Sequence, residues 1–413
     1  MKSAQYTCRS CGSTALKSVL SLGRTPLANA LLTEPQLAQP EETFPLELVF
    51  CPDCTLVQIT ETVPPEKLFR EYLYFSSFSD TMLRHARELV DEITDSRRLD
   101  SSSLVVELAS NDGYLLQYYM ERDVPVLGIE PAVNIARVAW EERGVPTISE
   151  FFGEELAGRL TAGGQKADVI HAHNVLAHVA DLNGFVEGIH VLLKEDGVAV
   201  IEVPYVKEMI DRCEFDTIYH EHLCYFSLTA LECLFRRHGM LIHDVKLVPL
   251  HGGSLRVYAT QAQGKYGQAR SAVRELLGEE TGWGVAAFAF YEGFAHRVEQ
   301  LKSALVGYLA GLKQQGKRLA AYGAAAKGST LLNYFGIGDD LLDFVVDRST
   351  YKQGRYMPGV HLPILAPEKL LEEMPDYVLL LVWNFADEVL EQQKEYRRAG
   401  GQFIIPVPEV SVV

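Results

Sequence analysis

Between residues 80 and 203, short apolar runs alternate with stretches whose apolar residues recur at helical spacing. The apolar runs are Leu104–Leu108, Val126–Ile129, Val169–Ala172 and Gly197–Val203, and the helical stretches are Asp80–Ile93, Tyr114–Glu121, Val133–Arg143 and Leu182–Leu193. Such alternation is typical of βαβ units, whose strands form a mainly parallel sheet covered by helices. The pattern therefore predicts an α/β domain, and it places polar residues that follow these strands at one edge of the sheet.

With 413 residues, the chain is too long for one ordinary domain, and its pattern changes twice. Residues 1–75 hold two cysteine pairs, several prolines and short strands, residues 76–262 carry the alternation, and residues 263–413 open with helical stretches over 268–315. A smaller alternating unit follows, with a helix at Ser329–Tyr334, a strand at Asp343–Val346, a helix at Pro367–Glu373 and a strand at Tyr377–Trp383. We therefore expect three domains, of which the second and third are Rossmann-like.

The charge balance limits the classes of partner. Acidic residues outnumber basic ones by 55 to 38, which gives a net charge of −17 and argues against a nucleic acid partner, because phosphate neutralisation needs a basic surface. Neither a targeting segment nor a membrane span is expected, since the longest apolar run, near Val378–Trp383, is far too short. Seven cysteines, four of them in pairs, fit metal binding in a reducing compartment, so we expect a cytoplasmic protein without membrane contact.

The two cysteine pairs predict a metal site. Cys8 and Cys11 form one C-x-x-C pair, and Cys51 and Cys54 form a second after an intervening stretch that is long enough to fold back. Two such pairs can place four thiolates tetrahedrally around zinc, which leaves no open position for chemistry. We therefore expect a structural Zn²⁺; free thiols or redox pairs are the alternatives. The other three cysteines are scattered and are expected to be apolar fillers.

The segment from Glu107 to Gly113 predicts a nucleoside site. An apolar strand breaks there into a turn of small residues, and the next strand ends in Glu130. A small-residue turn lets the backbone approach a ligand, and a carboxylate after the second strand can hold ribose hydroxyls. The dinucleotide pattern G-x-G-x-x-G is missing, which suits S-adenosylmethionine because that ligand has no pyrophosphate. Glu107 would face its ammonium group, although an ordinary strand-to-helix turn is the alternative.

The run Tyr219-His220-Glu221-His222 brings together groups that can move protons. A histidine with a pKa near neutral can remove a proton next to a ketone, a neighbouring carboxylate can fix its tautomer, and a tyrosine hydroxyl can donate to an enolate oxygen. Asn174 and His178 follow another predicted strand and should lie at the same sheet edge. Zinc binding by this run is disfavoured, because histidines at i and i+2 cannot share a helix face as in H-E-x-x-H.

These features together resemble one family. The chain resembles the sugar C-methyltransferases of antibiotic biosynthesis, which act on nucleotide-linked 4-keto-deoxysugars. The segments that carry this resemblance are the N-terminal cysteine block, Glu107–Gly113, Tyr219–His222, Tyr322–Gly328 and Val346–Gly354. The resemblance covers essentially the whole chain. It implies an N-terminal zinc-binding domain (1–75), a class I methyltransferase domain that binds S-adenosylmethionine (76–262) and a Rossmann-like C-terminal domain (263–413). The sugar would lie between the zinc-binding domain and the C-terminal domain.

The resemblance also implies residue roles. His222 would take the proton from the carbon next to the ketone, with C-3 expected, Tyr219 would handle the enolate oxygen, and Glu221 would support both. The cofactor site would comprise Glu107, Ala109, Ser110, Asn111, Gly113, Glu130, Pro131 and Asn174, and Ala109 departs from the glycine common at its position. The sugar nucleotide, expected to carry dTDP, would meet Tyr72, Tyr74, Ser76, Asn174, His178, Lys327, Ser329 and Lys352.

Several alternatives stay open. The same fold could methylate oxygen or nitrogen of a nucleotide sugar, or C-5 in place of C-3. A zinc-containing scaffold could also bind a nucleotide sugar without turnover. In the C-terminal domain, Gly323, Gly328 and Lys327 could cradle phosphate through backbone N–H groups and a positive charge, or the domain could be a nucleotide fold without a ligand.

Overall fold

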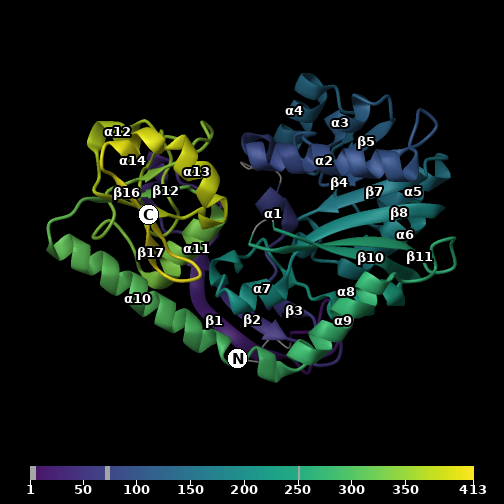
Figure 1. Ribbon diagram of the computed structural model, residues 1–413, viewed down its shortest axis with the longest axis horizontal. Coiled ribbons are helices and arrows are strands. Elements are labelled where there is room, and N and C mark those ends of the chain that lie inside the picture. The colour runs from purple at the N-terminus through teal and green to yellow at the C-terminus, as the bar shows by residue number, and fades with distance from the viewer. Residues whose placement is uncertain (1–5, 70–74, 250–251) are drawn as a thin grey trace.

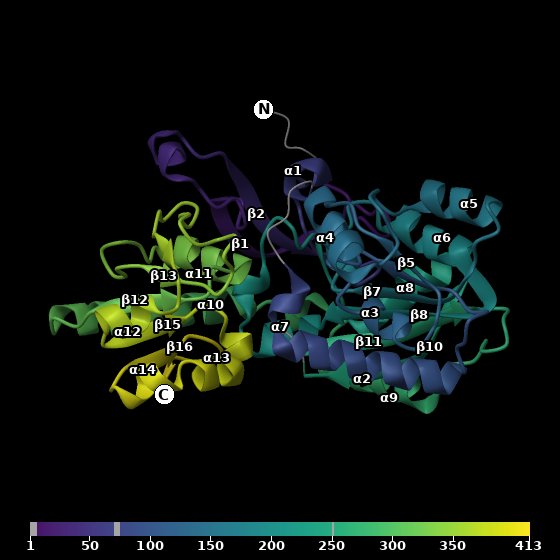
Figure 2. The ribbon, with the colours of Figure 1, turned by 90° about the horizontal axis from the view of Figure 1, so that it is seen from above.

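The computed structural model describes residues 6–69, 75–249 and 252–413, which form three β-sheets. Figure 1 shows two lobes side by side, the central lobe in blue and teal and the C-terminal lobe in green and yellow. The first strands of the chain lie below and between the lobes, as the view from above confirms (Figure 2). The structure is therefore an α/β protein in which the N-terminal domain contacts both other parts.

The central sheet has seven strands. In spatial order they are β10 (Met240–Val248), β11 (Ser254–Gln261), β8 (Leu193–Pro204), β7 (Ala167–His173), β4 (Val105–Leu108), β5 (Val126–Ile129) and β6 (Thr147–Ile148). The pairs among β8, β7, β4, β5 and β6 are parallel, whereas β11 joins β8 and β10 antiparallel. This Rossmann-like order confirms the fold class expected from the alternation, because near-continuous apolar strands buried on both faces require helices above and below.

Helices cover both faces of this sheet (Figure 1). They are α2 (Asp80–Arg97), α3 (Leu116–Met120), α4 (Val133–Arg143), α5 (Glu154–Ala162), α6 (Leu182–Leu192), α7 (Val206–Asp211) and α8 (Leu228–Arg237). The starts of α2, α6 and α8 are fixed by side-chain caps, from Ser79, Asp181 and Ser227 respectively. Each cap satisfies a backbone N–H group that the first helical turn leaves without an intrahelical partner.

The N-terminal sheet includes a strand from the middle of the chain. Its order is β1 (Lys17–Pro26), β2 (Thr43–Phe50), β3 (Val57–Ile59) and β9 (Cys224–Tyr225), all antiparallel. Two short helical segments, η1 (Glu34–Ala38) and α1 (Pro65–Phe69), lie in the same part of the chain. Because β9 follows Tyr219–His222 directly, the N-terminal sheet and the loop that carries these residues are one hydrogen-bonded unit.

The C-terminal part begins with two helices, α9 (Ser271–Trp283) and α10 (Phe294–Gln314), which run along the lower side of the molecule in Figure 1. A six-stranded sheet follows in the order β14 (Ile364–Leu365), β13 (Val345–Val346), β12 (Leu319–Tyr322), β15 (Tyr377–Leu380), β16 (Gln402–Ile405) and β17 (Ser411–Val412), parallel except for β17. Its helices are α11 (Ala326–Phe335), α12 (Lys369–Glu373), α13 (Ala386–Gln392) and α14 (Lys394–Arg398).

One predicted strand is too long. The apolar run Tyr377–Trp383 ends as a strand at Leu380, and Trp383 lies in the 3₁₀ turn η6 (Trp383–Phe385). The indole Nε1 of Trp383 donates to Oδ2 of Asp216, a residue of the central lobe, at 2.7 Å. A contact between lobes therefore determines where this strand ends, which no local pattern predicts. Among the helices in the described ranges, none is both long and apolar enough to cross a membrane.

Candidate active site

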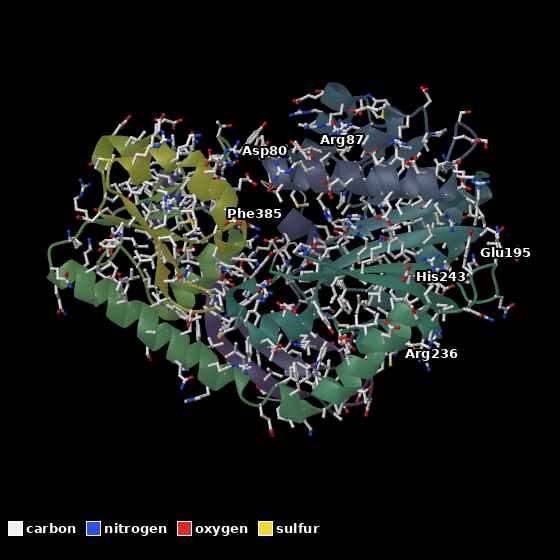
Figure 3. The ribbon with its side chains drawn as sticks, viewed as in Figure 1. Asp80, Arg87, Glu195, Arg236, His243 and Phe385 are labelled. Atoms are coloured by element: carbon white, nitrogen blue, oxygen red, sulfur yellow. The ribbon has the colours of Figure 1, made fainter. Side chains whose placement is uncertain are left out.

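A cavity of about 650 Å³ lies where the three parts of the chain meet. Figure 3 shows Phe385, which lines this cavity from the C-terminal lobe, across the junction from Asp80 at the start of α2. The lobes also touch directly, since Oγ1 of Thr81 donates to Oε2 of Glu388 at 2.7 Å. A ligand in this cavity would be surrounded by groups from all three domains.

The turn after β4 forms one wall through an unusual backbone. Ala109, Asn111 and Gly113 all have positive φ, at 53°, 49° and 77°. The left-handed region costs a residue with a Cβ roughly 1–2 kcal/mol, so Ala109 is strained where glycine would not be. The turn closes on the next strand, because the Ser110 N–H donates to the Ile129 carbonyl at 3.2 Å. The sharp bend beside the cavity therefore includes a strained backbone conformation at Ala109.

Of the residues expected to hold the cofactor, five line the cavity: Ala109, Asn111, Glu130, Pro131 and Asn174. Glu107, Ser110 and Gly113 are not among the lining residues of the described chain and lie one layer behind. Sequence reasoning missed Gly128 on β5, where an added Cβ would lie 2.5 Å from Oγ of Ser110. Gly128 therefore allows the turn to pack on β5, and its signal was a lone glycine inside an apolar strand.

Three buried carboxyl groups surround this turn. Burial, with Asp112 and Glu130 nearby, raises the pKa of Glu107 well above its usual range, and burial raises the pKa of Glu130 to about 7. Oε2 of Glu107 and Oδ1 of Asp112 are buried and find no hydrogen-bond partner among the described residues. Acids that are buried together without full compensation favour a cationic ligand. This environment fits a sulfonium ligand that also carries an ammonium group.

Glu130 is held by the backbone and is oriented for ligand binding. Its Oε2 accepts from the N–H of Asn111 at 2.9 Å, and its Oε1 accepts from the N–H of Ala132 at 2.8 Å. Each carboxylate oxygen has a second lone pair, so both can accept a further hydrogen bond from a ligand hydroxyl. A carboxylate fixed at the cavity wall after the second strand is placed as a ribose site requires.

His222 and Tyr219 form a hydrogen-bonded pair in the cavity wall. The Tyr219 hydroxyl lies 2.8 Å from Nε2 of His222, and Nδ1 of His222 lies 2.8 Å from the carbonyl oxygen of Thr217. A carbonyl oxygen only accepts, so Nδ1 carries the proton and Nε2 of the neutral ring is the acceptor. The imidazole is thus fixed with its basic nitrogen toward Tyr219.

The tautomer of His222 is set by a carbonyl that the sequence did not reveal. The sequence analysis assigned that role to the carboxylate of Glu221, but Nδ1 of His222 donates to Thr217. Oε1 of Glu221 accepts from Nδ2 of Asn29 at 2.8 Å, and Asn29 lines the cavity from the N-terminal domain. A backbone carbonyl has no residue-type signature, so Thr217 could not be recognised from sequence.

His178 lies against the pair formed by Tyr219 and His222. Its ring meets the His222 ring edge to face, with centroids 4.7 Å apart, and it lines the cavity together with Asn174. Burial lowers the pKa of His178 to about 4, so it is a neutral ring at physiological pH. His178 therefore places no positive charge next to the His222 ring. The structure thus brings together Tyr219, His222, Asn174 and His178, as the sheet-edge argument predicted.

The C-terminal lobe contributes a cation of unusual setting. Lys327 lines the cavity, and its buried Nζ lies 4.5 Å from the Trp383 ring centroid, with no described residue that accepts a hydrogen bond from it. Its charge acts on the buried carboxyls of Glu214 and Asp216 across the junction. An anion in the cavity would supply the oxygen acceptor that this ammonium group lacks.

The other predicted sugar contacts divide into three groups. Ser76 and Lys352 line the cavity, and Nζ of Lys352 donates to the Ala324 carbonyl at 2.9 Å. Ser329 is buried on α11 and is not among the described residues that line the cavity. Tyr72 and Tyr74 lie outside the described residues. Arg348 and Ser349 also line the cavity and were missed, although they belong to the segment Val346–Gly354.

The two cysteine pairs, which are about 40 residues apart in the sequence, lie together in the fold at a site away from the cavity. Their sulfur atoms all lie within 4.8 Å of one another, with Cys8 and Cys54 at 3.4 Å and Cys11 and Cys51 at 3.6 Å. Tetrahedral zinc with Zn–S bonds of about 2.3 Å would separate its sulfurs by about 3.8 Å. The four thiols therefore fit one zinc ion and would close its coordination sphere.

Comparison with known proteins agrees with this geometry. The chain is 38% identical over 406 residues to "C-methyltransferase NovU" from Streptomyces niveus, which covers 98% of this chain and 96% of that protein. The chain belongs to the C-methyltransferase family. Family models described as "Putative zinc binding domain", "Methyltransferase domain" and "C-methyltransferase C-terminal domain" match residues 8–69, 81–244 and 249–408 of this C-methyltransferase.

Two solved methyltransferase structures are similar to part of this C-methyltransferase. An S-adenosylmethionine-dependent methyltransferase from Clostridium acetobutylicum is 12% identical, covers 48% of this chain and 95% of that chain, and has a TM-score of 0.36. Magnesium protoporphyrin IX methyltransferase from Synechocystis with bound SAH is 14% identical, covers 43% of this chain and 83% of that chain, and has a TM-score of 0.34. Such low scores add nothing to the family assignment, which rests on the sequence matches. The protein is a methyltransferase with S-adenosylmethionine as cofactor and a four-cysteine zinc site.

Proposed function

We propose that this C-methyltransferase methylates the carbon next to the ketone of a nucleotide-linked 4-keto-deoxysugar. The observation that carries the proposal is the fixed pair of Tyr219 and His222 in a cavity that is also lined by Lys327. A carbon acid needs a base for its proton and a donor for the developing enolate oxygen, and this pair offers both. The cationic side of the cavity suits the diphosphate of a sugar nucleotide, and dTDP is the carrier that the family resemblance suggests.

In this scheme the Tyr219 hydroxyl turns from Nε2 of His222 to the ketone oxygen of the sugar. Nε2 then accepts the proton from the adjacent carbon, while the electron pair of the broken C–H bond moves into the enolate. When bound, S-adenosylmethionine would supply an electrophilic methyl group to that carbon, and the electron pair of the broken S–CH₃ bond would stay on sulfur. The imidazolium stays hydrogen-bonded to the Thr217 carbonyl and passes its extra proton to solvent, which restores the neutral ring.

Lys327, Lys352 and Arg348 give the phosphate side of the cavity its positive charge. Asn174 and His178 also line the cavity, and we assign the hexose to their side of it, because the His178 ring lies against His222. Glu221 supports the site indirectly, because it ties the catalytic loop to Asn29 of the N-terminal domain. We assign the methylated carbon to C-3, with C-5 as the alternative that the product structure decides.

Incubating the protein with dTDP-4-keto-deoxysugars and ¹³C-methyl-labelled cofactor in deuterated water tests the proposal. We expect a product whose labelled methyl is bonded to carbon, and deuterium at the carbon next to the ketone when the cofactor is left out. NMR correlations of the labelled methyl then separate C-3 from C-5. A methyl bonded to oxygen or nitrogen, or sugar binding without turnover, would contradict the proposal.

The raised pKa of Glu130 predicts a pH-dependent cofactor affinity. Glu130 must be ionised to accept ribose hydroxyls, and with a pKa of about 7 it is mostly protonated at pH 6 and mostly ionised at pH 8. Because the pKa of Glu130 is raised to about 7, its ionisation is completed only above pH 7. The affinity for S-adenosylmethionine should therefore rise with pH. We expect the Kd for S-adenosylmethionine, measured by isothermal titration calorimetry, to fall roughly five- to tenfold over this interval.

Glu130→Gln should bind the cofactor more weakly and with a flat pH profile between pH 6 and 8. Asp112 and Glu107, the other acids at the turn, are kept in this variant. Glu195→Gln is the matched control, since Glu195 is an exposed carboxylate at the far end of the central lobe (Figure 3). A pH profile that persists unchanged in the Glu130 variant would assign the dependence to another group.

A further inference from the structure

The loop that carries the catalytic pair ends as a strand of the zinc-binding domain. β9 begins two residues after His222 and pairs antiparallel with β3, where Cys224 lies opposite Gln58. The residue next to His222, Leu223, also takes part, because its carbonyl accepts from the N–H of Ile59 at 3.0 Å. The position of His222 is therefore tied to the position of β3.

Gln58 joins β3 to the first cysteine pair. Its side chain is 1% exposed, and both ends of its amide are used: the Arg9 N–H donates to Oε1 at 2.8 Å, and Nε2 donates to the Thr7 carbonyl at 3.0 Å. Thr7 and Arg9 are the two neighbours of Cys8. The side-chain amide of Gln58 is therefore hydrogen-bonded to the backbone on both sides of a zinc ligand.

Arg9 strengthens the same attachment from inside the pair. Its Nη2 donates to the carbonyls of Ile59 at 3.2 Å and Glu61 at 3.0 Å. These bonds extend along β3 and beyond its end. These hydrogen bonds connect the first cysteine pair to β3, which pairs with the strand after His222. A displacement of the cysteine pair would therefore also displace β3.

The choice of residue at position 58 needs an explanation. The flanking strand positions are the buried, apolar Val57 and Ile59, and a buried amide is costly unless its hydrogen bonds are satisfied. An apolar side chain would suit burial alone. A glutamine with both ends bonded to the backbone around Cys8 provides a directional link that apolar packing would not.

We propose that Gln58 is a positioning residue, through which the zinc-bound cysteine pair sets the place of His222 relative to the cavity. The proposal rests on the proposed role of His222, and it gives the zinc site a task beyond stabilising a small domain. A shift of about 1 Å in a reacting group can cost about a hundredfold in rate, so a loosened β9 lowers turnover while the cofactor still binds.

Gln58→Leu, which keeps the bulk of the side chain and removes both hydrogen bonds, tests this in the zinc-loaded full-length protein. Gln261→Leu is the matched control: Nε2 of Gln261, at the end of β11, donates to the carbonyls of His190 on α6 at 3.3 Å and of Leu193 on β8 at 3.1 Å. The measurements are zinc content, cofactor affinity, hydrogen exchange of residues 219–226 and of 198–203 by mass spectrometry, and kcat and KM for the ketosugar.

For Gln58→Leu we expect about one zinc per chain, faster exchange confined to residues 219–226, and a kcat lowered by about tenfold or more with KM changed less than about threefold. The Gln261 variant should match the unmodified protein in residues 219–226 and in kcat. Unchanged exchange in residues 219–226 together with an unchanged kcat would overturn the proposal, as would equal effects of both substitutions.

Gln58→Glu keeps an acceptor for the Arg9 N–H but places a carboxylate oxygen against the Thr7 carbonyl, so it also breaks the link on that side of Cys8. It should likewise speed exchange in residues 219–226, and it carries the same test if the leucine variant does not fold. Exchange is measured without any substrate. Faster exchange in a protein that never methylates carbon would therefore overturn the proposed function and leave the positioning role supported.

Discussion

Replacing His222 with glutamine is expected to lower kcat for carbon methylation by about a thousandfold, within the range that general acid–base catalysis contributes. Glutamine approximates the size of the ring and can still donate to the Thr217 carbonyl, but it has no basic nitrogen. Cofactor affinity should stay unchanged, and deuterium exchange at the carbon next to the ketone should disappear. Single-turnover kinetics with proton NMR of the sugar measure both effects.

Two further variants sharpen this test. Tyr219→Phe keeps the aromatic ring and removes the hydroxyl that lies against Nε2, so it should lower kcat and slow deuterium exchange at the carbon next to the ketone. His243→Gln is the control, because His243 lies at the outer side of the central lobe (Figure 3) and is not among the described residues that line the cavity. A His222 variant that still exchanged the proton at the normal rate would show that the base is another group.

The second large effect is expected from loss of a zinc ligand. Cys54→Ser should reduce bound zinc from about one per chain to near zero and lower Tm by about 10 °C or more, because the metal supplies folding free energy that a small domain lacks. Cys54 is buried, and its sulfur lies 3.4 Å from that of Cys8. Atomic absorption and calorimetry provide the two measurements.

Cys233→Ser is the matched control, since Cys233 is half-buried on α8 and outside the group of four sulfurs. It should keep its zinc and change Tm by no more than about 2 °C. A Cys54 variant that lost its metal and melted at the normal temperature would show that zinc does not stabilise the fold.

The turn after β4 could be predicted only in part from the sequence. An apolar strand, small residues and a second strand ending in Glu130 were visible as a pattern, and the structure places Ala109, Asn111 and Glu130 on the cavity wall. The strain at Ala109 and the close packing of Gly128 on Ser110 were not visible. They depend on backbone angles and on the distance between two strands, and residue types alone do not specify either.

Local order in the chain determined the parallel sheets and the metal site. The period of apolar residues reports which faces are buried, and the spacing of Cys8, Cys11, Cys51 and Cys54 reports a tetrahedral ligand set. The tertiary structure decided which distant groups share the cavity. Asn29, His222 and Lys327 come from three domains, and β9 leaves the central domain to join the N-terminal sheet. The physical reason is that periodicity is a property of neighbours along the chain, whereas these contacts arise only when separately formed surfaces pack together.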